Sequence, residues 1–122
     1  SPAYYLVAHG IEEAFKAFLR SRGLSLKALR CIGHNLDHAL GAAVSHGIED
    51  LCALTAQDKA MIGILNPYYK AKHFEYRVTG FMSLPQLQDL LDLGDRVLAA
   101  IKSACEASVG VKTHSSGRAT RR

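Results

Sequence analysis

The chain has 122 residues, the length of one domain with a single hydrophobic core. Hydrophobic residues make up 48% of it, but no apolar run approaches the roughly 18 residues that span a bilayer, so we expect no membrane partner. The formal charge is +4, yet residues 1–109 carry 11 cations against 11 acids, which excludes a strongly basic body. We therefore expect a neutral domain at 1–109 and a basic, flexible C-terminal tail at 110–122.

The cysteines and the chain start indicate where the protein works. Cys31, Cys52 and Cys105 are widely spaced and form no Cys-x-x-Cys pair, which is typical of reduced, mostly buried thiols. The chain opens at Ser1 rather than Met and shows no charged-then-apolar leader of the secretory kind, so its true start stays open. We expect a soluble, cytoplasmic protein.

The first expected helix runs from Pro2 to about Arg22, because apolar residues recur there at three- and four-residue steps. Glu12 is spaced to pair with Lys16 on the outer side of this helix. Gly23 is placed to end the helix in a left-handed turn.

Two helices are expected next. Ser25 can cap a short helix that Gly33 breaks. A longer helix then runs roughly from His34 to His46, and Gly47 ends it.

Two further helices complete the fold. Thr55 and Asp58 resemble a capping box for a third main helix, which Pro67 should perturb or end. The last main helix is expected at about 84–108, with Ser83 as its cap and Pro85 in its first turn. With no internal repeat and no two well-spaced strand patterns, the prediction is all-α: an antiparallel bundle of four main helices plus short helical pieces.

The stretch YYKAKHFEYR at residues 68–77 concentrates rings and cations between the last two helices. Past Tyr69 the apolar pattern has a period of two, which indicates an extended segment. In one interpretation Phe74 and Tyr76 hold a long connection on the bundle while the polar side faces water. In the other, tyrosine rings and cations form a groove for a base and a phosphate.

The stretch RCIGHNLDH at residues 30–38 holds the other dense set of polar groups. His34 and His38 are four residues apart and would share a helix face, as helical zinc ligands do. The zincin pattern needs Glu after the first His, and Asn35 stands there, so we expect no metal. The alternative is a turn at the start of a helix, with His34 bonded locally and His38 in a partly buried polar spot.

Standard catalytic motifs are not found in the sequence. No Ser lies in a Gly-x-Ser-x-Gly elbow, and the ten glycines are dispersed rather than gathered in a phosphate-binding loop. We expect no catalytic residue of these standard kinds and no cofactor.

Residues 1–108 resemble the HEPN family, helical domains of higher eukaryotes and prokaryotes linked to nucleotide and RNA binding. The resemblance is carried by SPAYYLVAHGIEEAFKAFLRSRG with its His9, Glu12 and Lys16, by LRCIGHNLDHAL, by NPYYKAKHFEYR and by the proline-started final helix. It implies a helical bundle that pairs as a homodimer.

Catalytic members of that family are metal-independent ribonucleases whose motif is Arg, four to six residues, then His. Here Arg30 and His34 have three residues between them, Arg30 and His38 have seven, and no His follows Arg77 within reach. This departure argues against catalysis, although a His proton shuttle and an Arg that neutralises phosphate charge remain chemically reasonable.

The leading hypothesis is a non-catalytic or weakly catalytic HEPN-like domain that binds a nucleotide or RNA as a homodimer. The alternatives are a protein-interaction module, such as an antitoxin-like accessory protein that docks a protein partner, and an active metal-independent ribonuclease. The expected ligand-binding residues are Arg30, His34, Tyr69, Lys72, His73 and Arg77.

Overall fold

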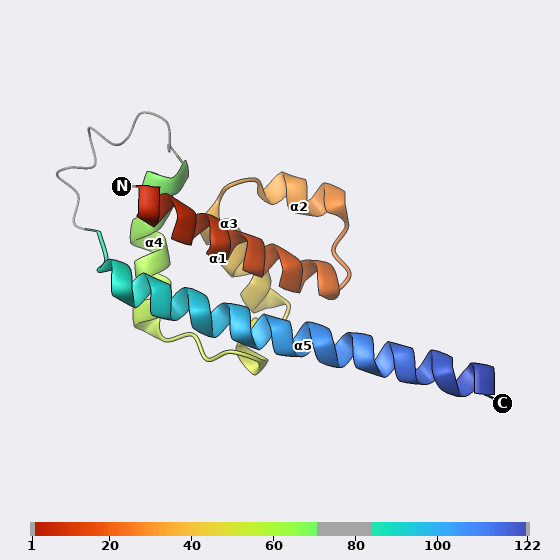
Figure 1. Cartoon of the computed structure of the whole chain (residues 1–122). Helices are drawn as coiled ribbons and strands as arrows, with labels where there is room; N and C mark the ends of the chain where they lie inside the picture. Colours follow the sequence, from red (N-terminus) through yellow and green to blue (C-terminus); the bar gives the residue numbers. More distant parts are fainter. Residues whose placement is uncertain (1, 71–83, 122) are drawn as a thin grey trace.

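The computed structural model in Figure 1 describes residues 2–70 and 84–121. The elements are α1 (Pro2–Ser21), α2 (Leu26–Ile32), α3 (Leu36–Ser45), the 3-10 turn η1 (Ile48–Asp50), α4 (Ala56–Lys70) and α5 (Leu87–Arg121). No strand occurs among the described residues, so the predicted all-α class is confirmed. Within the same residues, no helix combines the length and the apolar character that crossing a membrane requires.

Helix α1 lies at the centre of the fold, between α5 on one side and α2 and α3 on another (Figure 1). Its apolar ladder is buried, as the three- and four-residue spacing predicts. The core around it draws on every helix and includes Phe15, Phe18, Leu36, Ile62, Leu65, Leu90, Leu93 and Val97.

Helices α1 and α5 run in the same direction. At their beginnings the Tyr4 hydroxyl donates to the Pro85 carbonyl at 2.7 Å, and further along Gly94 faces Ile11. The expected antiparallel arrangement is therefore wrong for this pair. A short loop forces the two helices that it joins to run in opposite directions. No such loop joins α1 to α5, because α2, α3 and α4 lie between them in the chain.

Helices α4 and α5 do run antiparallel. Near the start of α4, Arg96 of α5 contacts Asp58, with Nη2 2.8 Å from Oδ1. Towards the end of α4, Ile64 lies beside Leu84, which precedes α5. The Thr55 and Asp58 capping box is confirmed: the Asp58 amide donates to Thr55 Oγ1 at 3.0 Å, and the Thr55 amide donates to Asp58 Oδ2 at 2.9 Å.

The turns around α2 follow the sequence. Gly23 has a φ of 101°, in the left-handed region, after the end of α1. Ser25 caps α2 by accepting from the Ala28 amide, and Gly33 ends α2 at a φ of 61°. These predictions are confirmed, but α3 begins later than expected: Asn35 is its cap, so His34 lies in the turn before it.

Two helices end later than expected: of the two expectations for Pro67, that it perturbs or ends its helix, the end there is wrong, and so is the end of the last helix at about 108. Helix α4 continues past Pro67 to Lys70, because Tyr68 and Tyr69 are buried and their burial outweighs the helix hydrogen bond that Pro67 cannot make. Helix α5 begins at Leu87, after Pro85, and continues beyond residue 108 to Arg121. No proline follows residue 85, so no residue of this helix lacks the backbone amide that its hydrogen bonds need. Ser83 lies outside the described residues, and the domain boundary at 109 stays a prediction.

Candidate functional site

Glu12 is a charged residue in the middle of the core. Its side chain is 0% exposed, so the prediction that Glu12 lies on the outer side of α1 is wrong. The pairing itself is confirmed, because Lys16 Nζ lies 2.5 Å from Glu12 Oε2. A buried carboxylate is costly unless several donors satisfy it, so its other partners matter.

Three more side chains surround Glu12 and, with Lys16, form what we call the Glu12 cluster. The Tyr69 hydroxyl donates to Oε1, and His34 Nδ1 lies 3.0 Å from the same oxygen. His9 Nδ1 lies 3.2 Å from the Tyr69 hydroxyl and 4.0 Å from Glu12 Oε1. The cluster thus joins α1, the turn between α2 and α3, and the last turn of α4.

The turn that carries His34 is held by a second polar network. Asn66 of α4 is buried, and its Oδ1 accepts from the Leu36 amide at 2.8 Å. Its Nδ2 donates to Asn35 Oδ1 at 3.1 Å and to Asp37 Oδ2 at 3.0 Å. Asn66 therefore fixes the start of α3 on α4, three residues before Tyr69, and so sets where His34 meets Glu12.

The electrostatics of the cluster keep Glu12 ionised. Burial raises the pKa of Glu12, but the hydrogen bonds from His34, Lys16 and Tyr69 outweigh burial and hold that pKa below its ordinary value. Burial first, and then the bond to Glu12, raise the pKa of Tyr69 above its ordinary value. The phenol therefore keeps its proton and donates a hydrogen bond to the carboxylate.

Counting protons then assigns the histidine tautomers. The ionised carboxylate has no proton to donate, so His34 Nδ1 must carry one to make its bond to Glu12. The single Tyr69 proton points to Glu12, so its oxygen can only accept from His9, whose Nδ1 must also be protonated. With Nδ1 protonated, the neutral form of either ring has Nε2 as an acceptor.

Both histidines reach the surface. The side chains of His9 and His34 are 45% and 54% exposed, although each ring is tied to the buried carboxylate network through Nδ1. The His9 ring also stacks on Tyr5 with centroids 6.2 Å apart, and the His34 ring meets Tyr69 edge-on at 6.0 Å. The result is a pair of accessible imidazoles, each oriented by a hydrogen bond through Nδ1.

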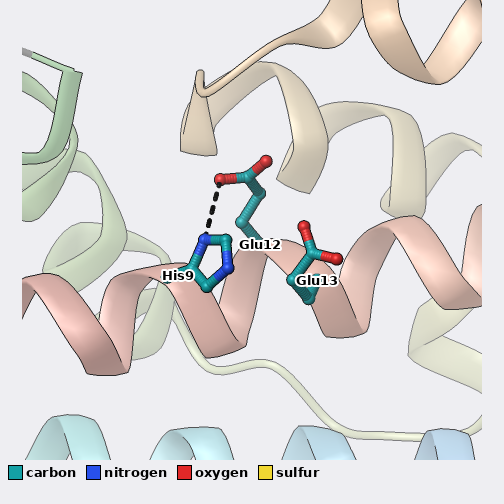
Figure 2. A group of neighbouring side chains, drawn as sticks. All are labelled: His9, Glu12 and Glu13. Atoms are coloured by element: carbon teal, nitrogen blue, oxygen red, sulfur yellow. Dashed lines mark ion pairs between the residues drawn. The ribbon is translucent and has the colours of Figure 1, made fainter.

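Figure 2 shows His9, Glu12 and Glu13, whose ligand atoms all lie within 4.8 Å of one another. This spacing is compatible with a metal ion, but both Glu12 oxygens already accept hydrogen bonds from neighbouring side chains. A metal ion would have to displace those donors and would lie close to the Lys16 ammonium. These residues therefore fit a hydrogen-bond network around an ionised carboxylate better than they fit a metal site.

The structure brings together only part of the predicted ligand surface. His34 is in the cluster, and Arg30 is exposed in the last turn of α2, four residues earlier. Tyr69 is 1% exposed, so its ring supports the site from inside and offers no face for a base to stack on. Lys72, His73 and Arg77 lie outside the described residues, but the chain leaves α4 at Lys70, directly after Tyr69.

Sequence reasoning missed the role of three residues of the first helix. His9, Glu12 and Lys16 were part of the family pattern, but they were not predicted as a site. A signal was present: Glu12 follows Ala8 by four residues and precedes Phe15 by three, so it lies on the buried ladder. His34 does not share a helix face with His38, which is exposed on α3.

Comparison with protein families, with curated proteins and with solved structures finds no match to this chain. The function is therefore inferred from the Glu12 cluster and its surroundings.

Proposed function

We propose that this chain is a helical domain that binds a nucleotide or RNA at the surface formed by His9, His34 and Arg30. One observation carries the proposal: a buried, ionised Glu12 orients two accessible histidines beside the point where α4 ends. The connection that starts there contains Lys72, His73 and Arg77. Resemblance to the HEPN family supports the same function, with a homodimer as the working form.

The chemistry of the two rings suits a nucleotide. A neutral imidazole with Nδ1 protonated presents Nε2 as an acceptor for a ribose hydroxyl or a base N–H group. A protonated ring presents Nε2–H to a phosphate oxygen instead. Arg30, Lys72 and Arg77 are the cations that would pair with phosphate, and arginine does so with two parallel hydrogen bonds.

The arrangement is better suited to binding than to cleavage. Glu12 accepts from the Nδ1 of His34 and indirectly orients His9, which fixes both rings in one tautomer. Arg30 precedes His34 by four positions, which is too close for the nuclease motif described above. We therefore propose a non-catalytic or weakly catalytic protein.

A protein-interaction module is the second candidate function. The observation that favours it is the exposure of large apolar side chains, with Leu6 at 65%, Leu26 at 56% and Leu98 at 51%. In that case a protein partner docks on the helices and the Glu12 cluster only stabilises the fold.

Isothermal titration calorimetry with adenosine monophosphate and with a short single-stranded RNA tests the proposal. His34→Gln should weaken binding about tenfold, and the double change Lys72→Gln with Arg77→Gln should cost roughly 1 to 3 kcal/mol of binding free energy. The matched control is His38→Gln, because His38 is exposed on α3 and is not part of the cluster. No heat of binding to the native protein, or equal effects of His34→Gln and His38→Gln, would favour the interaction module.

A further inference from the structure

We propose that His34 binds the phosphate group of the ligand as an imidazolium, so that binding takes up a proton at this ring while His9 stays neutral. This inference rests on the proposed function and goes beyond it, because it assigns the phosphate to one of the two histidines. It also makes the affinity for a phosphate depend on pH. The two rings differ in the hydrogen bonds that they make, and this difference carries the assignment.

His34 is the ring that bonds directly to the buried charge. Its Nδ1 lies 3.0 Å from Oε1 of Glu12, whose side chain is 0% exposed. Burial raises the pKa of Glu12, but the hydrogen bonds from its neighbours outweigh burial and keep the carboxylate ionised. A hydrogen bond from a protonated ring to a carboxylate is roughly twice as strong as one between neutral groups. A positive charge on His34 is therefore stabilised from inside the protein.

His9 bonds to a neutral group instead. Its Nδ1 lies 3.2 Å from the hydroxyl of Tyr69 and 4.0 Å from Glu12 Oε1. Glu13 lies beside His9 in Figure 2, but it is exposed, so water and salt screen its charge. His9 is therefore the less favourable place for a proton, and its Nε2 remains an acceptor for a hydroxyl or N–H group of the ligand.

The charges around His34 cancel while both rings are neutral. Among the described residues, the parts of α1, α2, α3 and α4 near this ring carry three carboxylates, Glu12, Glu13 and Asp37, and three cations, Lys16, Arg30 and Lys70. A phosphate brings up to two negative charges, so a proton that enters with it restores part of the balance. The His34 side chain is 54% exposed and is bonded inward through Nδ1, which leaves Nε2 for the ligand.

Phosphate binding should therefore weaken as the pH rises. A proton on His34 favours the bound phosphate, and by reciprocity the bound phosphate favours the proton. The affinity should fall across the range in which histidine loses its charge, about pH 5 to 8, by up to about tenfold per pH unit for one proton. A phosphate monoester gains its second negative charge near pH 6, so its own titration acts in the opposite direction.

Isothermal titration calorimetry of the whole chain with adenosine monophosphate tests the inference. Titrations at about pH 7.5, where this phosphate is already a dianion, in buffers of different ionisation enthalpy give the number of protons taken up. The native protein should take up a proton, in an amount that approaches about one per ligand. His34→Gln should abolish both the uptake and the fall in affinity with pH. His38→Gln, a change at an exposed histidine of α3, is the matched control and should preserve both.

Two further ligands identify the source of the phosphate. Adenosine has no phosphate, and a short single-stranded RNA with hydroxyl groups at both ends has only internal ones. Proton uptake with adenosine monophosphate alone identifies a terminal phosphate as the bound group, whereas uptake with the RNA identifies an internal one, and either result supports the proposal. Equal uptake with adenosine would overturn it, because no phosphate would then be needed.

Proton–nitrogen NMR spectra show which ring holds the proton. With adenosine monophosphate at saturation, both ring nitrogens of His34 should be protonated, whereas His9 should keep its Nδ1–H tautomer. Protonation of His9 instead, binding without proton uptake, or uptake that persists in His34→Gln would overturn this inference and leave the proposed function standing. Failure of all three ligands to bind would overturn both.

Discussion

The Tyr69 hydroxyl of α4 donates a hydrogen bond to Oε1 of Glu12 in α1, a residue 57 positions earlier in the chain. The same oxygen also accepts a hydrogen bond from His34, and the other carboxylate oxygen accepts one from Lys16. One buried carboxylate therefore connects α1, the turn before α3 and the end of α4, and it orients the histidines that we propose to bind a ligand.

Removing this carboxylate should be strongly destabilising. Glu12→Ala leaves the partly buried Lys16 ammonium and the buried Tyr69 hydroxyl without their acceptor, which we expect to cost about 3 to 5 kcal/mol of unfolding free energy. Urea denaturation measures the loss. Glu13→Ala, next to it but exposed, is the matched control and should change stability by about 0.5 kcal/mol or less. A loss below about 1 kcal/mol for Glu12→Ala would contradict the central role of the carboxylate.

The Tyr69 hydroxyl can be removed with little change in shape. Tyr69→Phe loses its hydrogen bond to the charged Glu12, which we expect to cost about 1.5 to 3 kcal/mol, and also the acceptor of the His9 ring. Tyr4→Phe, which loses a bond to a neutral carbonyl, should cost only about 0.5 to 1.5 kcal/mol. Equal losses in urea denaturation for the two variants would show that Glu12 is not charged when it accepts from Tyr69.

The ion pair of Asp58 and Arg96 should make the stability of the fold depend on pH. The Arg96 hydrogen bonds lower the pKa of Asp58 below its ordinary value of about 3.9, although burial acts in the opposite direction. A lowered folded-state pKa means that the stabilisation is complete above the unfolded value and is lost as the pH falls through the folded value.

The stability difference between the native protein and Arg96→Gln should therefore be full at neutral pH and should shrink below about pH 4. Unfolding free energies measured by urea at a series of pH values test this. Arg22→Gln is the control, because Arg22 lies over the Phe18 ring, without a carboxylate partner in the described part of the chain. A difference that grows towards acid pH would reverse the sign and contradict the assignment.

Local sequence signals predicted the helices but not how they pair. Helix-end signals act over three or four residues, so they can be read directly from the sequence. They include the Ser25 cap, the capping box of Thr55 and Asp58, and the left-handed turn at Gly23. The direction of α1 relative to α5 depends on contacts such as Tyr4 with Pro85, which no local pattern encodes. The continuation of α4 past Pro67 likewise depends on the burial of Tyr69 by distant residues.

The candidate site was also predictable only where local sequence signals mark its residues. His34 stood out because it follows Gly33 in a turn between helices. Glu12 was assigned to the outer side because its spacing to Lys16 is common on exposed faces, although its place on the apolar ladder indicates burial. The hydrogen bond that His9 makes in the site is to Tyr69, so this part of its role depends on the folded contact between α1 and α4.

The basic tail should contribute affinity without specificity. Residues 110–122 carry four cations and no acid, so their deletion should remove most of the salt-sensitive binding to RNA. The slope of log affinity against log salt should fall by up to about 3, given about 0.7 for each phosphate contact on a single strand. An unchanged slope in fluorescence anisotropy would show that the tail does not contact RNA.

The most direct test of the proposed function is the imidazole NMR spectrum of the protein during titration with single-stranded RNA or adenosine monophosphate. Before ligand is added, two-bond proton–nitrogen correlations should show His9 and His34 as Nδ1–H tautomers. On titration, their Nε2 signals should shift while those of His38 and His46 stay in place. The absence of shifts at His9 and His34 at saturating ligand, or shifts confined to His38 and His46, would contradict the account.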